Sequence, residues 1–214
     1  MKIRLIVAGM LCSMAAMAQL NEDITDTRNK REGYAKLPKV GIRQELAGFT
    51  MSGIEESVGK LPLDKMPYTA QGPNFMRFEN ETVKAAVTTE AFDASKYKLE
   101  YDEKYLVKIN KKTYYGGYPN VPKTKVSSVS FIIGKDTVAI PPAAYGDLYN
   151  LNLTYRDKGG KERSLNSVYF SKDKRTIYLY LYSKDTTYAN ASYEVTFVIQ
   201  DKKYLRRVLD YDIE

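Results

Sequence analysis

Tyrosine is the residue type in this chain whose spacing offers the clearest binding chemistry. The chain has 19 tyrosines, and Tyr114, Tyr115 and Tyr118 surround a Gly116-Gly117 pair in a turn-rich segment. Each phenol ring is a flat apolar plate with a polar tip, so such a group can stack on a sugar or grip a peptide. Loops held by a rigid scaffold are where binding residues concentrate. We therefore take these three tyrosines as candidate ligand-binding residues.

A second group of tyrosines follows the period of a β-strand. Tyr178, Tyr180 and Tyr182 alternate with three aliphatic residues, which places them on one face of a predicted strand. This face is a further candidate ligand-binding surface. The pattern also fits a sheet that is covered on one side, because tyrosine has a high strand propensity and suits a sheet face that is partly exposed to solvent. Both interpretations stay open.

The residue types needed for most enzyme chemistry are scarce in this chain. It contains no His, and its one Cys, Cys12, lies in a predicted leader. A mature chain without imidazole or thiol has no Ser-His-Asp triad, no Cys nucleophile and no His/Cys zinc site. We expect no cofactor, no catalytic residue and no metal-binding residue.

Carboxylates are the remaining acid/base groups. Glycoside hydrolysis needs two carboxyl groups that face one bond, but the sequence does not bring any particular pair together. Asp210, Asp212 and Glu214 alternate near the C-terminus, a spacing that can collect oxygen ligands for a hard cation. A solvated chain end explains the same pattern, and we favour that interpretation.

The N-terminus has the features of a cleavable signal peptide. Lys2 and Arg4 precede an apolar stretch that ends at Ala16-Met17-Ala18, a small-x-small cleavage site. We predict a signal peptide over residues 1–18, a mature chain that starts at Gln19, and no membrane span in that form. The expected location is the periplasm or the outer cell surface.

The charges of the chain are interspersed. The full sequence has 33 Lys+Arg and 26 Asp+Glu. Removal of Lys2 and Arg4 with the leader leaves 31 against 26, a net charge of +5. A mixture of both signs is typical of a solvated surface and not of a phosphate-binding stripe. We expect no nucleic-acid partner.

The elements that must position the tyrosines are predicted to be strands. A polar segment at 19–33 indicates a flexible tether, and Gly and Pro punctuate a loop-rich, partly β region at 34–95. From residue 96 to 214 about seven short strands alternate with turns and lack long helices between them, which favours antiparallel pairing. We predict a mainly β protein whose C-terminal part is an antiparallel β-sandwich of immunoglobulin-like size.

Three segments carry a resemblance to a known group of proteins. They are VKINKKTYYG at 107–116, IPPAAYGDLYNLN at 140–152, and YEVTFVIQDKKYLRRV at 193–208. With these segments the chain resembles uncharacterised exported proteins of Bacteroidetes-type bacteria. The resemblance implies export and an all-β domain, and it carries over no functional residue. Two tripeptides, Asp136-Thr137-Val138 and Asp185-Thr186-Thr187, also resemble the sequence that such bacteria O-glycosylate on the central Thr.

Three functions follow from these features. The leading hypothesis is a non-catalytic exported β protein that binds a glycan or a protein partner through tyrosine-rich surfaces. The second is a carboxylate-dependent hydrolase that acts on glycans. The third is a structural component of the cell envelope that pairs with another chain through an edge strand.

Overall fold

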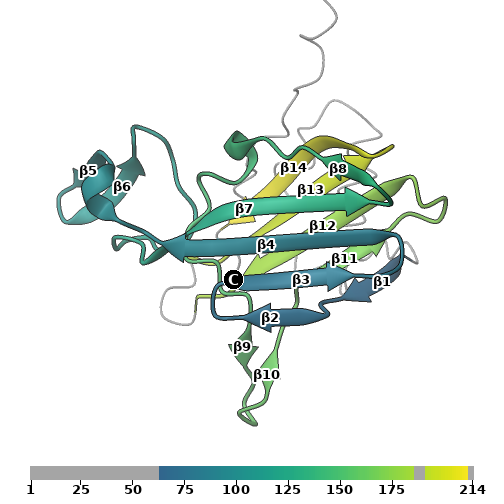
Figure 1. Ribbon diagram of the computed structural model, residues 1–214. Coiled ribbons are helices and arrows are strands. Elements are labelled where there is room, and N and C mark those ends of the chain that lie inside the picture. Colours follow the sequence, from purple (N-terminus) through teal and green to yellow (C-terminus); the bar gives the residue numbers. More distant parts are fainter. Residues whose placement is uncertain (1–62, 186–190, 212–214) are drawn as a thin grey trace, which may run out of the picture.

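The computed structural model describes residues 63–185 and 191–211 (Figure 1). The predicted leader and tether lie outside these residues. The fold is mainly β, as the strand pattern predicted, and its strands pair antiparallel in two five-stranded sheets. Neither of the two short 3-10 helices in the described part has the length or apolar character that a membrane crossing needs.

Sheet A contains the last four strands of the chain and the first described one. In spatial order it comprises β1 (Asp64–Pro67), β11 (Ser167–Phe170), β12 (Thr176–Ser183), β13 (Tyr193–Gln200) and β14 (Lys203–Tyr211). Sheet B comprises β2 (Ala70–Gly72), β3 (Phe75–Glu79), β4 (Val83–Ala91), β7 (Thr124–Ile133) and β8 (Asp136–Val138). Because β1 pairs with β11 and β4 with β7, both sheets contain strands from either side of residue 96.

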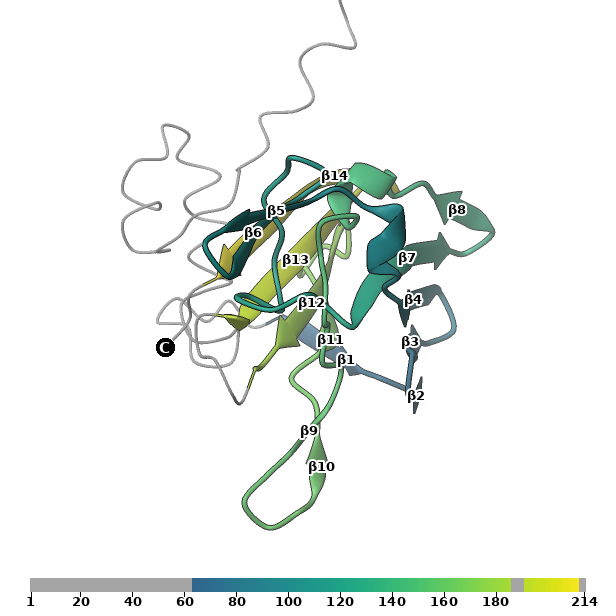
Figure 2. The same cartoon turned by 90° about the vertical axis from the view of Figure 1, so that its left-hand side faces the viewer.

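The two sheets form the layers of a sandwich, seen from a second side in Figure 2. The strand alternation explains the core between them. Phe78 and Phe131 from sheet B and Leu179 and Phe197 from sheet A are all fully buried in one cluster. Burial of side chains of this size stabilises a fold by about 2–3 kcal/mol each. Core packing is therefore what holds the layers together.

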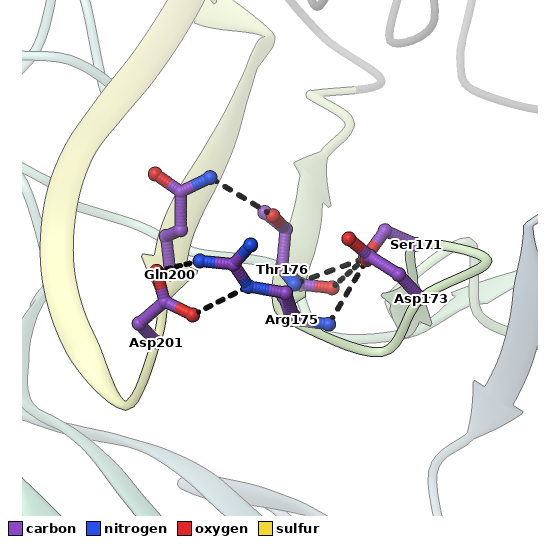
Figure 3. A network of polar contacts seen from close by, with 6 residues as sticks. All are labelled: Ser171, Asp173, Arg175, Thr176, Gln200 and Asp201. Atoms are coloured by element: carbon purple, nitrogen blue, oxygen red, sulfur yellow. Dashed lines mark hydrogen bonds and ion pairs between the residues drawn. The ribbon is translucent and has the colours of Figure 1, made fainter.

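Two hairpin turns meet at one end of sheet A. The guanidinium of Arg175, in the turn before β12, donates to both carboxylate oxygens of Asp201 at 2.8 and 2.9 Å (Figure 3). Asp201 lies in the turn between β13 and β14. The hydroxyl of Ser171 donates to Asp173 and receives the backbone N–H of Thr176. Side-chain hydrogen bonds thus hold both turns in place.

Two smaller hairpins project from the sandwich (Figure 1). One comprises β5 (Leu99–Asp102) and β6 (Tyr105–Ile109), and the other comprises β9 (Tyr155–Arg156) and β10 (Glu162–Arg163). The short helices η1 (Ala94–Lys96) and η2 (Pro142–Ala144) lie in connections. The alternation of Leu151, Leu153 and Tyr155 in the sequence predicts a strand that begins at Leu151. That prediction is wrong, because β9 begins at Tyr155 and residues 151–154, of which Leu151 and Leu153 are buried, form no strand.

Candidate functional site

The β5–β6 hairpin and its connection to β7 form a small aromatic core beside the sandwich. The core contains Tyr114 and Tyr149 as buried residues, and Phe92 and Tyr97 pack against it. The ring of Tyr149 meets Tyr114 edge-to-face at 5.8 Å and Phe92 edge-to-face at 5.2 Å. Such contacts add about 1 kcal/mol each beyond burial, so the rings hold one another in position.

A cavity of about 410 Å³ opens against this core. That size is suited to a small-molecule ligand. Its aromatic wall is formed by Tyr97, Tyr114 and Tyr149. The rest of the lining consists of Ile109, Asn110, Lys112, Thr113, Pro142, Ala143, Gly146 and Asp147. We call this cavity the tyrosine pocket.

Two chain segments that are distant in sequence make the wall of the tyrosine pocket. The backbone N–H of Tyr115 donates to the backbone carbonyl of Asp147, and the N–H of Tyr149 donates to the backbone carbonyl of Tyr115. The approach is so close that a Cβ on Gly116 would lie 2.0 Å from the carbonyl oxygen of Tyr149. Gly116 also has φ +85°, a conformation that favours glycine. The glycine therefore permits the contact that places Tyr114 near Tyr149.

The buried phenols of the pocket are neutral at physiological pH. The hydroxyl of Tyr114 donates to the carbonyl of Leu106 at 3.0 Å. Burial raises the pKa of Tyr114 well above its usual value, and burial likewise raises the pKa of Tyr149 to about 12. These two side chains are only 8% and 3% exposed, so they contribute apolar and uncharged ring surface to the wall of the pocket.

Tyr97 is oriented by a charged partner. The ammonium of Lys125 donates to the Tyr97 hydroxyl at 2.7 Å and forms an ion pair with Glu90 at 2.9 Å. The hydrogen bond to Tyr97, followed by that to Glu90, raises the pKa of Lys125. Lys125 therefore stays protonated. Because the Tyr97 oxygen accepts this bond, its own proton remains available to donate.

A second ion pair supports the opposite wall. The guanidinium of Arg207, on β14, donates to the two carboxylate oxygens of Asp147 at 2.5 and 2.7 Å, and to the carbonyl of Ala144 at 3.1 Å. A two-pronged bond of this kind fixes orientation as well as distance. The sandwich thereby positions the η2 loop against the pocket.

The three tyrosines predicted on the loop at 114–118 occupy different environments. Tyr114 is in the pocket wall, whereas Tyr115 is buried in the main core between the sheets. Tyr118 is exposed, and its ring lies 6.3 Å from that of Tyr105. The sequence neighbours thus contribute to a pocket, a core and a surface.

The tyrosines predicted on β12 form a separate cluster. Tyr178, Tyr180 and Tyr182 do lie on one face, together with Tyr169 of β11. The expectation that this face is partly exposed to solvent is wrong at Tyr180, whose side chain is only 2% exposed. The Tyr180 hydroxyl donates to the buried carboxylate of Glu194 on β13. The tyrosines of this face take no part in the lining of the tyrosine pocket.

Sequence reasoning missed four of the residues that shape the pocket: Tyr97, Lys125, Asp147 and Tyr149. The local sequence favours a turn at Asp147 and a short helical turn that ends at Tyr149. Both lie beyond η2, which ends at Ala144. The Gly116-Gly117 pair was the usable signal, because adjacent glycines indicate a close backbone approach.

Two cavities formed by the described residues each have a single carboxylate in their lining. The tyrosine pocket has one in its lining, Asp147. A second cavity of about 450 Å³, beside β2 and β10, also has one, Glu162. The described residues contain no group of three His, Cys, Asp or Glu side chains placed to hold a metal ion. Of the predicted glycosylation sites, Thr137 is exposed on β8, and Thr186 lies outside the described residues.

Comparison of the chain with protein-family models, with curated proteins and with solved structures gave no match.

Proposed function

We propose that this protein is an exported, non-catalytic binding protein whose tyrosine pocket takes a glycan. The observation that carries the proposal is the convergence of Tyr97, Tyr114 and Tyr149 on a cavity of about 410 Å³ with a polar rim. A sugar ring has apolar C–H faces and hydroxyl edges, so it matches aromatic plates surrounded by hydrogen-bonding groups.

The chemistry of the site favours binding over hydrolysis. A glycosidase places two carboxyl groups on either side of the scissile bond. Asp147 provides the one carboxylate in the lining of the tyrosine pocket, and Arg207 forms an ion pair with it. The absence of His from the whole chain removes the commonest general base. We therefore rank the hydrolase hypothesis below binding.

Export is supported by the leader pattern at 1–18. The mature chain would then lack Cys, which suits a protein stabilised outside the cytoplasm by core packing and not by disulfides. Intact mass measurement of the native protein tests this part of the proposal. A chain that starts at Gln19 is the expected result, and a cytoplasmic chain that retains Met1 would overturn it.

A glycan array followed by calorimetric titration of the best ligand tests the binding proposal. Tyr97→Ala should weaken binding about ten-fold or more, since loss of one stacked ring costs roughly 1.4 kcal/mol or more. Tyr101→Ala is the matched control, because Tyr101 is exposed and lies outside the pocket lining. No glycan bound, or equal losses in both variants, would contradict the proposal.

An exposed aromatic surface next to the pocket supports a second candidate, a protein partner. Four of the five large exposed hydrophobic residues in the described part of the chain come from this one region: Tyr101, Tyr105, Tyr118 and Val121. Exposed aromatic groups of this kind are enriched at interfaces. If Tyr118→Ala abolishes binding of a co-purifying protein while Tyr97→Ala does not, the functional surface is the exposed one.

A further inference from the structure

We propose that the tyrosine pocket selects ligands that carry a carboxylate, such as an acidic sugar, over their neutral counterparts. This inference rests on the binding function proposed above and specifies its ligand class. It follows from the charges at the pocket, taken one at a time.

Two charged groups, Asp147 in the pocket lining and Lys125 bonded to the pocket residue Tyr97, are each paired with an opposite charge. The carboxylate of Asp147 is paired with Arg207 at 2.5 Å. The ammonium of Lys125 is paired with Glu90 at 2.9 Å. Each of the two pairs therefore has no net charge.

Lys112 is the cation that remains. It lines the pocket, and among the described residues its ammonium forms no ion pair with a carboxylate. Among the described residues, the pocket lining therefore has one positive charge without a carboxylate partner, Lys112, and no negative charge without a cationic partner. Such a site attracts an anion and disfavours a second cation.

The backbone places Lys112 at a defined position. Its N–H and C=O exchange hydrogen bonds with those of Ile109, both at 3.0 Å. Between them, Asn110 and Lys111 have φ of 51° and 64°, as in a type I′ turn. The side-chain oxygen of Asn110 also receives the N–H of Lys98 at 2.8 Å. Because these hydrogen bonds anchor the turn at both ends, the backbone of Lys112 has a fixed position at the rim of the pocket.

Tyr97 supplies a neutral donor at the same pocket. Its oxygen accepts a hydrogen bond from the Lys125 ammonium, which leaves the phenol proton to donate to a ligand. A carboxylate has two acceptor oxygens and forms stronger hydrogen bonds than a neutral oxygen does. The pairing of an ammonium with a phenol donor thus favours a carboxylate over an ester or a hydroxymethyl group.

Calorimetry with oligogalacturonides and their methyl esters tests the inference, because the two ligands differ in charge and share the same rings. The full mature protein should bind the acid form about ten-fold more tightly. Lys112→Gln should remove this preference, so that the acid form and the ester bind with similar affinity. Lys111→Gln is the matched control, since it removes the same charge one residue away and outside the pocket lining.

Equal affinity of the wild-type protein for acid and ester would overturn the inference and leave the proposed binding function standing. An equal loss of preference in Lys111→Gln and Lys112→Gln would also overturn it, because general surface charge would then be the cause. Binding of neither ligand form would overturn the proposed glycan-binding function and the inference with it.

Discussion

Arg207 and Asp147 join the edge strand of sheet A to the loop that forms one wall of the tyrosine pocket. Their two hydrogen bonds, at 2.5 and 2.7 Å, link residues 60 positions apart in the sequence. Both side chains are largely shielded, with exposed fractions of 14% and 23%. The pocket is therefore held to the sandwich by a shielded ion pair, and changes to this pair should affect folding and binding together.

Loss of the Arg207 side chain should destabilise the fold. We expect Arg207→Ala to lower the free energy of unfolding by about 1–3 kcal/mol, because the Asp147 carboxylate loses its charged donor in a shielded setting. Urea denaturation measures the effect. Arg175→Ala is the control, since it breaks an equally well-formed pair with Asp201 that is exposed to solvent. The control should leave the midpoint nearly unchanged, and a larger effect in the control would contradict the assigned role of shielding.

Truncation of two neighbouring side chains of β7 should change the free energy of unfolding by very different amounts. Phe131 is fully buried between the sheets, whereas Ile132 points to the outer face and is 38% exposed. Phe131→Ala should cost about 3–5 kcal/mol through lost burial and the cavity left behind. Ile132→Ala should change the free energy of unfolding by less than about 0.5 kcal/mol. Similar costs for the two variants would mean that the face assignment of sheet B is incorrect.

Gly116 should not accept a side chain. An added Cβ would lie 2.0 Å from the Tyr149 carbonyl oxygen and 2.7 Å from the ring of Tyr193. Gly116→Ala should therefore destabilise the protein by about 3 kcal/mol or more and impair ligand binding, since the 113–117 segment must move off the 147–149 segment. Gly134→Ala is the matched change, because Gly134 also has positive φ but open space around it. It should cost about 1 kcal/mol. A tolerated Gly116→Ala would show that the two segments are not in close contact.

Stability should fall in alkaline solution. Burial raises the pKa values of Tyr149 and Tyr169 to about 12, whereas an unfolded tyrosine ionises near about 10. Below about pH 10 both states keep these phenols neutral, and the stability is fully present. Between about pH 10 and 12 the unfolded chain releases protons that the folded chain retains, so the free energy of unfolding decreases as pH rises.

Urea midpoints across this alkaline range check the effect. The double variant Tyr149→Phe and Tyr169→Phe should show a shallower decrease than the wild type. Tyr101→Phe, on an exposed ring, should follow the wild-type curve. Identical curves for all three proteins would rule out the buried phenols as the cause.

The strands of the C-terminal part could be predicted from sequence because their periodicity is local. The tyrosines of β12 alternate with Ile177, Leu179 and Leu181, and these three aliphatic residues are buried in the core between the sheets. The same logic was right for the hairpin that joins β13 and β14. In β6 the alternation predicts that Tyr105, Val107 and Ile109 share the packed face. Ile109 is buried as predicted, whereas Tyr105 is exposed and Leu106 is buried. A register shift in the pairing of β5 with β6 accompanies this difference.

The pocket could be predicted only in part, because its walls come from contacts across long sequence separations. Tyr114 was a candidate from its own neighbourhood. Its partner Tyr149 is brought to it by backbone bonds between 115 and 147–149, and no local pattern encodes that pairing. The charge pairing of Asp147 with Arg207 is equally non-local. What the sequence did indicate was the Gly-Gly signal next to aromatic residues, which marked one side of the site.

The most direct test of the tyrosine pocket is to record the ring resonances of selectively labelled tyrosines during titration with a bound glycan. We predict that the signals of Tyr97, Tyr114 and Tyr149 shift together and saturate at one ligand equivalent, while those of Tyr178 and Tyr182 on sheet A stay in place. Shifts confined to the sheet A tyrosines, with the three pocket rings unmoved, would contradict the assignment of the binding site.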